Sequence, residues 1–158
     1  MANTSNDLIT ASPPMFAGTD SHAVRYGDFI ALVARVCIGW LFLVNGWAKV
    51  MNMAGFTAYL TNLKVPSPSL WAWPAMLSEL LIGIALILGL ATRYASLYTF
   101  IYLLIATVLA HRYWEYPQAQ QLNQYNHFLK NVAMMGGALL LYVTGPGRFS
   151  VDRWLRRS

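Results

Sequence analysis

The chain has 158 residues, of which 57% are hydrophobic and only 11% charged, and its mean hydropathy is +0.43. A soluble domain carries about 25% charged residues. The composition therefore excludes a soluble globular domain, a disordered chain and a disulfide scaffold, and it predicts a membrane protein. The net charge is +5, but the basic residues lie between and beyond apolar blocks, so we expect no nucleic-acid partner.

The amino-terminal segment differs in composition from the rest of the chain. Residues 1–24 are mostly small and polar and include Pro13-Pro14, which predicts a flexible tail. A transmembrane domain is predicted over residues 25–154, and a short basic end over residues 155–158. The lipid bilayer is thus the first partner expected.

Four apolar segments are long enough, or nearly long enough, to cross a bilayer. A transmembrane helix needs about 20 apolar residues for about 30 Å of hydrocarbon. The runs are continuous, whereas strands of a membrane barrel would alternate between apolar and polar residues. We predict an all-α, polytopic four-helix bundle with spans at about 29–50, 70–90, 93–112 and 127–144.

The connections between the spans carry their own signals. Apolar residues recur at helical spacing within residues 52–68, which predicts a short helix after the first span. That helix either lies in the membrane interface or packs over the mouth of the bundle. The tight turn at residues 91–93 makes the second and third helices antiparallel neighbours, and Gly145-Pro146-Gly147 ends the fourth helix.

Basic residues predict the orientation of the bundle. One side would carry most of the arginines, and the other side would carry Lys64 and Arg112. Because basic residues accumulate on the cytoplasmic side, both termini are predicted to be cytoplasmic. The arginines of that side are Arg25, Arg93, Arg148, Arg153, Arg156 and Arg157.

Charged residues inside spans are the candidate site. Each costs about 2.5–3.5 kcal/mol in a bilayer, so such residues face the bundle and find partners. We expect Lys49, Glu79, His111 and Lys130, with Asn45, to converge in the outer half of the bundle. Arg35 approaches from the cytoplasmic side and is a candidate ion-pair partner of Glu79. The alternatives are that Arg35 reaches water or anchors its helix, and that Lys49, His111 and Lys130 are interfacial anchors.

The first span presents one informative stripe. Its residues are spaced by 4, 3, 4 and 3 positions, so they share a helix face, and its two glycines permit close contact with another helix. The stripe consists of Arg35, Gly39, Phe42, Gly46 and Lys49. Met51 and Met53 are a poor copper site with only two thioethers, so no metal site is predicted.

The order of these motifs resembles the DoxX family of membrane proteins. The resemblance rests on the first-span stripe and on Glu79-x3-Gly83, followed by Gly89-x2-Thr92-Arg93. Lys130-Asn131 and the tail Gly145-Pro146-Gly147-Arg148-x-Ser150-x-Asp152 also match. The resemblance implies a four-helix inner-membrane protein. It also implies a link to quinone chemistry, because related subunits occur in thiosulfate:quinone oxidoreductases.

Two functions of different classes follow from this resemblance and from the polar residues. The first is an accessory or quinone-interacting subunit of a membrane oxidoreductase. In it Glu79 is a proton acceptor or hydrogen-bond partner, Lys49 and Lys130 are cations for an anionic oxygen, and Arg35 keeps Glu79 ionised. The sequence shows no haem, iron–sulfur or flavin motif, so any electron carrier would come from a membrane or soluble redox partner or from a quinone dissolved in lipid. The second is a non-catalytic scaffold or assembly factor. A transporter is less favoured, since four spans line a path only in a homo-oligomer.

Overall fold

The computed structural model of the protein describes residues 21–156. Residues 1–20 of the predicted tail and residues 157–158 of the predicted basic end lie outside this range. Residues 21–24 belong to the predicted tail, but they open the first helix instead. All regular structure in the described range is helical.

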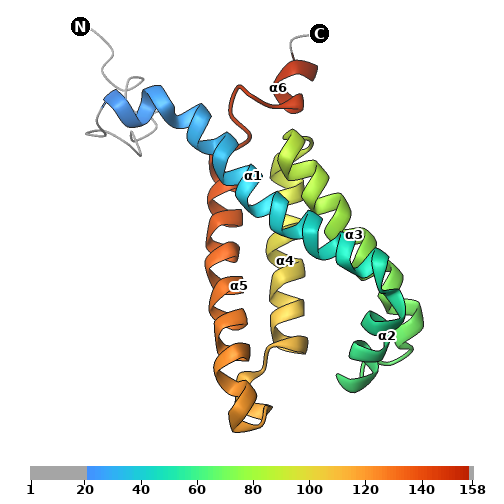
Figure 1. Ribbon diagram of the computed structural model, residues 1–158. Coiled ribbons are helices and arrows are strands. Elements are labelled where there is room, and N and C mark those ends of the chain that lie inside the picture. The colour runs from blue at the N-terminus through green and yellow to red at the C-terminus, as the bar shows by residue number, and fades with distance from the viewer. Residues whose placement is uncertain (1–20, 157–158) are drawn as a thin grey trace, which may run out of the picture.

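The helices follow the predicted order along the chain (Figure 1). A short helix follows the first long helix, as expected, and the last long helix begins at Gln118 rather than near residue 127. The elements are α1 Ser21–Met51, α2 Met53–Asn62, α3 Pro68–Leu88, α4 Thr92–Ala110, η1 Tyr113–Glu115, α5 Gln118–Thr144 and α6 Val151–Leu155.

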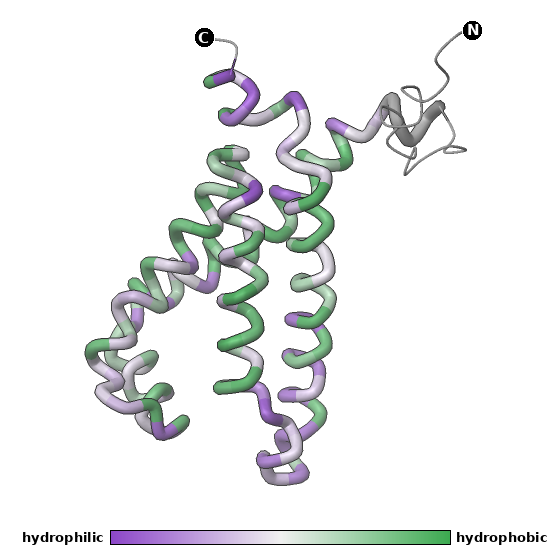
Figure 2. Tube along the Cα trace, turned by 180° about the vertical axis from the view of Figure 1, so that it is seen from behind, coloured by the Kyte–Doolittle hydropathy of each residue, from purple (hydrophilic) through white to green (hydrophobic). Residues whose placement is uncertain are grey.

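Three of these helices are long and apolar enough to cross a membrane. Their spanning segments are Tyr26–Met51, Pro68–Leu88 and Thr92–Glu115. α5 is 27 residues long and packs along α4, but it carries more polar residues than the other three (Figure 2). The fold is therefore helical and multi-pass, while the fourth span and the cytoplasmic placement of both termini stay predictions.

The tightest helix contact joins α1 to α3. A Cβ atom on Gly39 would lie 2.9 Å from the Gly83 carbonyl oxygen, and one on Gly83 would lie 2.9 Å from the Gly39 carbonyl oxygen. Gly46 is similarly close to Leu80 of α3. The two backbones touch because neither helix has a side chain there, which confirms the close contact predicted from the glycine stripe.

Large apolar side chains cover much of the surface of the bundle, and its interior holds both apolar and polar residues. Phe29, Trp40 and Leu140 are among the many large apolar side chains that are exposed. The buried face of α4 instead carries hydroxyl residues at helical spacing, namely Thr92, Ser96, Thr99 and Thr107. Apolar side chains on the surface and hydroxyl groups on the buried face of α4 fit a protein that is dissolved in lipid.

The carboxyl-terminal segment folds back over the α3–α4 turn. α5 ends at Gly145, whose φ of 82° favours glycine. The Asp152 amide donates to the Gly89 carbonyl at 3.0 Å, and the Asp152 carboxylate accepts from the amides of Ala91 and Thr92 at 2.6 and 2.8 Å. These two amides open α4, so Asp152 satisfies helix donors that would otherwise lack partners.

Candidate functional site

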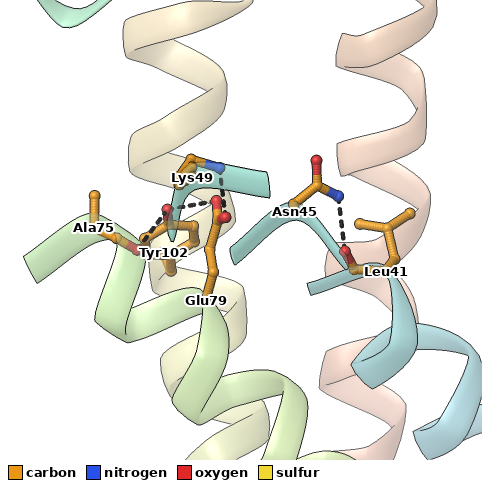
Figure 3. Close-up of polar contacts among 6 residues, drawn as sticks. All are labelled: Leu41, Asn45, Lys49, Ala75, Glu79 and Tyr102. Carbon is orange, nitrogen blue, oxygen red and sulfur yellow. Dashed lines mark hydrogen bonds and ion pairs between the residues drawn. The ribbon is translucent and has the colours of Figure 1, made fainter. Parts of the chain in front are cut away.

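A buried carboxylate joins three helices of the bundle. Glu79 of α3 lies 2.5 Å from the ammonium of Lys49, in the last turn of α1. Tyr102 of α4 donates its hydroxyl to the other carboxylate oxygen of Glu79 at 2.8 Å. Figure 3 shows the three side chains meeting between the helices. We call Lys49, Glu79 and Tyr102 the triad; its Lys49–Glu79 contact joins charged groups from two separate helices.

Helix α2 covers one side of the triad. The Lys49 ammonium lies 4.9 Å from the centre of the Phe56 ring, within the range of a cation–π interaction. The side chains of Lys49 and Glu79 remain 18% and 11% exposed. An ammonium has three N–H donors, so Lys49 keeps donor capacity after binding Glu79. The triad therefore offers the spare N–H donors of Lys49 beside a carboxylate at a site that is not fully closed.

Asn45 does not join the triad. Its side-chain amide donates to the Leu41 carbonyl of its own helix at 2.7 Å. Figure 3 shows this bond apart from the triad. Asn45 thus satisfies its donor one turn back along α1, as short polar side chains commonly do in helices.

Arg35 does not pair with Glu79, and the predicted ion pair is wrong. Its side chain is fully buried and donates to the carbonyls of Leu86 at 3.3 Å and Phe149 at 2.5 Å. Along α1, Arg35 and Lys49 are separated by ~21 Å. Arg35 therefore lies beside the α3–α4 turn and the carboxyl-terminal segment, at the opposite end of the bundle from the triad.

His111 and Lys130 form a second polar group between α4 and α5. His111 shares a hydrogen bond of 2.8 Å with Gln124 and stacks on the His127 ring, with centroids 5.1 Å apart. The Lys130 ammonium lies 3.1 Å from His127 Nδ1. Within residues 21–156, no hydrogen bond or ion pair links this group to the triad. The residues that we expected to form one polar cluster therefore lie in two separate groups.

Several partners are not predicted by the sequence. Tyr102 lies in the middle of the uncharged run 94–110, and nothing in that run marks it as the donor to Glu79. Asn131 is buried and donates to the Thr107 hydroxyl at 2.9 Å, which ties α5 to α4. The sequence does carry a signal for Asn131, because an amide beside Lys130 in an apolar run needs a partner.

A recess separate from the triad lies between α2 and the α4–α5 connection. It has a volume of about 550 Å³ and includes Tyr59, Lys64, Arg112 and Tyr116 in its lining. Partial burial of Tyr59, which is 37% exposed, together with the neighbouring Tyr116, raises the pKa of Tyr59 to about 12. Among the described residues, no group of three or more His, Cys, Asp or Glu is arranged to hold a metal ion.

Comparison of the sequence with known proteins identifies the family of the chain. No solved structure matches the chain. It is 35% identical over 139 residues to the inner membrane protein YphA of Escherichia coli K12, covering 84% of this chain and 99% of that protein. It is also 35% identical over 130 residues to the inner membrane protein YqjF of the same organism, covering 82% and 95%. The DoxX family model matches residues 30–112. The chain belongs to the DoxX family and is a multi-pass inner-membrane protein.

Proposed function

We propose that this protein is an accessory, quinone-interacting subunit of a membrane oxidoreductase system. The observation that carries the proposal is the triad: a carboxylate that meets an ammonium and a phenol from two other helices, inside an apolar bundle. A small-molecule site commonly combines apolar walls with a few convergent polar groups.

The residues of the triad suit a quinone headgroup. Lys49 has N–H donors beyond the one that Glu79 takes, and Tyr102, whose single hydroxyl proton is donated to Glu79, holds that carboxylate in place. Glu79 is the group that accepts a proton and holds it at a carboxylate oxygen. A bound quinone would supply the two-electron redox chemistry: it would take two electrons from the partner oxidoreductase and two protons, one passed on by Glu79 and one from water. Arg35 has no place in this site, since it lies ~21 Å away along α1.

Quinone retention tests the proposal. The full chain is purified in mild detergent, and quinone is extracted and measured per mole of protein. We expect Glu79→Gln and Tyr102→Phe to retain about tenfold less quinone than wild type, which corresponds to about 1.4 kcal/mol. Glu115→Gln is the matched control, because Glu115 is half-exposed and pairs with Arg112 outside the triad. Retention that is equal in wild type and Glu79→Gln contradicts the proposal.

A second candidate is a non-catalytic scaffold for a membrane or soluble partner protein, or for a second copy of the chain. The observation that favours it is mutual satisfaction, since both oxygens of Glu79 already have donors within the protein. In this case Glu79→Gln lowers the thermal stability in detergent while quinone retention is unchanged. Tyr102→Phe separates the two candidates further, because it removes a donor and leaves the Lys49–Glu79 ion pair in place.

A further inference from the structure

A charged cavity lies at the Arg35 end of the bundle, far from the triad. Its volume is about 520 Å³, and it is bounded by α1, the start of α4, the loop after α5, and α6. The loop is shaped by Gly145 and Gly147, both with positive φ. The charged lining consists of Arg93, Arg148, Arg153, Arg156, Asp28 and Asp152.

Both carboxylates in this lining already have partners. Asp28 accepts from the Arg148 amide at 2.8 Å and lies 3.5 Å from Arg148 Nε. Asp152 accepts from the first amides of α4. Two negative charges are therefore engaged in holding the loop and capping a helix.

The arginines that line the cavity outnumber its carboxylates. Arg93, Arg153 and Arg156 form no ion pair within the described part of the chain. Arg93 donates to the Val143 carbonyl at 3.3 Å, which leaves most of its five N–H donors available. Three guanidinium groups with spare donors thus face one cavity, and a guanidinium matches the oxygens of a phosphate in a two-bond geometry.

Large apolar side chains lie next to this basic cavity. Phe149, Trp154 and Leu155 are 47%, 69% and 53% exposed. Aromatic rings prefer the level of the lipid headgroups, and basic pockets at helix ends bind anionic headgroups. The spanning segments of α1 and α4 begin at Tyr26 and Thr92, next to the lining residues Asp28 and Arg93. The basic cavity therefore meets the bilayer where phosphates are found.

We propose that this cavity binds the phosphodiester headgroup of an anionic phospholipid, with Arg93, Arg153 and Arg156 as its phosphate ligands. Bound lipid would hold the carboxyl-terminal segment against the α3–α4 turn. The reason is that Arg93 lies in α4, whereas Arg153 lies in α6 and Arg156 directly follows it. The proposal is independent of the quinone proposal, since the two sites share no residue.

Native mass spectrometry of the full chain in detergent tests this site. The protein is mixed with phosphatidylglycerol, with phosphatidylcholine, or with inorganic phosphate alone. We expect wild type to retain phosphatidylglycerol, and Arg93→Gln/Arg153→Gln to retain about tenfold less. Arg153→Gln/Arg156→Gln, which leaves the Arg93–Val143 contact intact, is expected to show a similar loss. The control Arg112→Gln/Lys64→Gln also removes two positive charges, but at the opposite end of the bundle. It should retain lipid as wild type does.

Three outcomes overturn the proposal. Equal retention of phosphatidylcholine and phosphatidylglycerol shows that the arginines do not select an anionic headgroup. Binding of inorganic phosphate without retention of lipid shows a site for a free anion. An equal loss in the Arg112→Gln/Lys64→Gln control shows that only the overall charge matters. The thermal unfolding midpoint of every variant is measured in parallel to check that it folds. If one of the two double variants in the cavity does not fold, the other one tests the site.

Discussion

Arg35 of α1 donates to the carbonyl of Phe149, 114 positions further along the chain, at 2.5 Å. The same guanidinium donates to Leu86 near the end of α3. The carboxylate of Asp152, three residues after Phe149, is close enough to attract the Arg35 guanidinium electrostatically. One buried cation thus joins the first helix, the α3–α4 turn and the carboxyl-terminal segment. Its partners are main-chain carbonyls, which need a donor when they are buried.

Replacing this cation should loosen the carboxyl-terminal segment. Arg35→Met keeps a long side chain but leaves the carbonyls of Leu86 and Phe149 without their donor. We expect the free energy of unfolding to fall by about 3 kcal/mol, since each hydrogen bond from a charged group contributes about 1.5–3 kcal/mol. Unfolding in detergent measures the change, and proteolysis should cut first after α5. Arg112→Gln is the control, because the Arg112 side chain is 38% exposed and, among the described residues, pairs only with Glu115 three residues on; an equal loss there contradicts the role assigned to Arg35.

The glycine contact between α1 and α3 predicts a second stability change. A methyl group on Gly39 or Gly83 meets a backbone carbonyl at 2.9 Å, which cannot move away as a side chain can. We expect Gly39→Ala and Gly83→Ala each to lower the free energy of unfolding by about 1–3 kcal/mol. Gly136→Ala is the matched control, because a Cβ there meets nothing within 4 Å. If all three variants unfold alike, close backbone contact does not hold α1 against α3.

The Lys49–Glu79 pair should show strong coupling. Glu79→Gln leaves Lys49 without a counter-ion, and Lys49→Met leaves Glu79 with only Tyr102 as a donor. We expect each single change to lower the free energy of unfolding by about 3 kcal/mol, and the double change to lower it by no more than either one. A double-mutant cycle in detergent measures the coupling. Additive effects contradict a direct pair, and the exposed Arg112–Glu115 pair gives the reference, at about 0.2–1 kcal/mol.

Much of the fold can be predicted from hydropathy and spacing. The long apolar runs, the short helix after the first span and the helix end at Gly145 follow from local rules on length, period and glycine. The stripe that contains Gly39 and Gly46 also predicts which face of α1 meets another helix. The start of α5 is earlier than hydropathy predicts, because its first turns are polar and hydropathy follows apolar residues alone.

The partners of the charged residues are harder to predict. A charge in a span requires a partner, and the depth of Lys49 and Glu79 makes them neighbours. Arg35 instead binds main-chain carbonyls, which every residue carries, so no residue type marks them in the sequence. Tyr102 is not marked either, because a hydroxyl on an aromatic ring has no charge that demands a partner. Long-range contacts such as Arg35–Phe149 depend on the folding back of the chain, which local patterns do not encode.

Tyr59 on α2 provides a pH-dependent test of the region beside the α4–α5 connection. Burial and Tyr116 raise its pKa to about 12, above the usual value of about 10. The folded protein therefore favours the neutral phenol, and this contribution to stability is fully present below about pH 10. As the pH rises from about 10 to about 12, the unfolded chain ionises first and the contribution is lost. We expect the advantage of wild type over Tyr59→Phe in thermal unfolding to shrink across that window. Tyr94→Phe, at an exposed tyrosine of α4, is the control; a constant difference between wild type and Tyr59→Phe up to about pH 12 would show that Tyr59 is not held neutral against Tyr116.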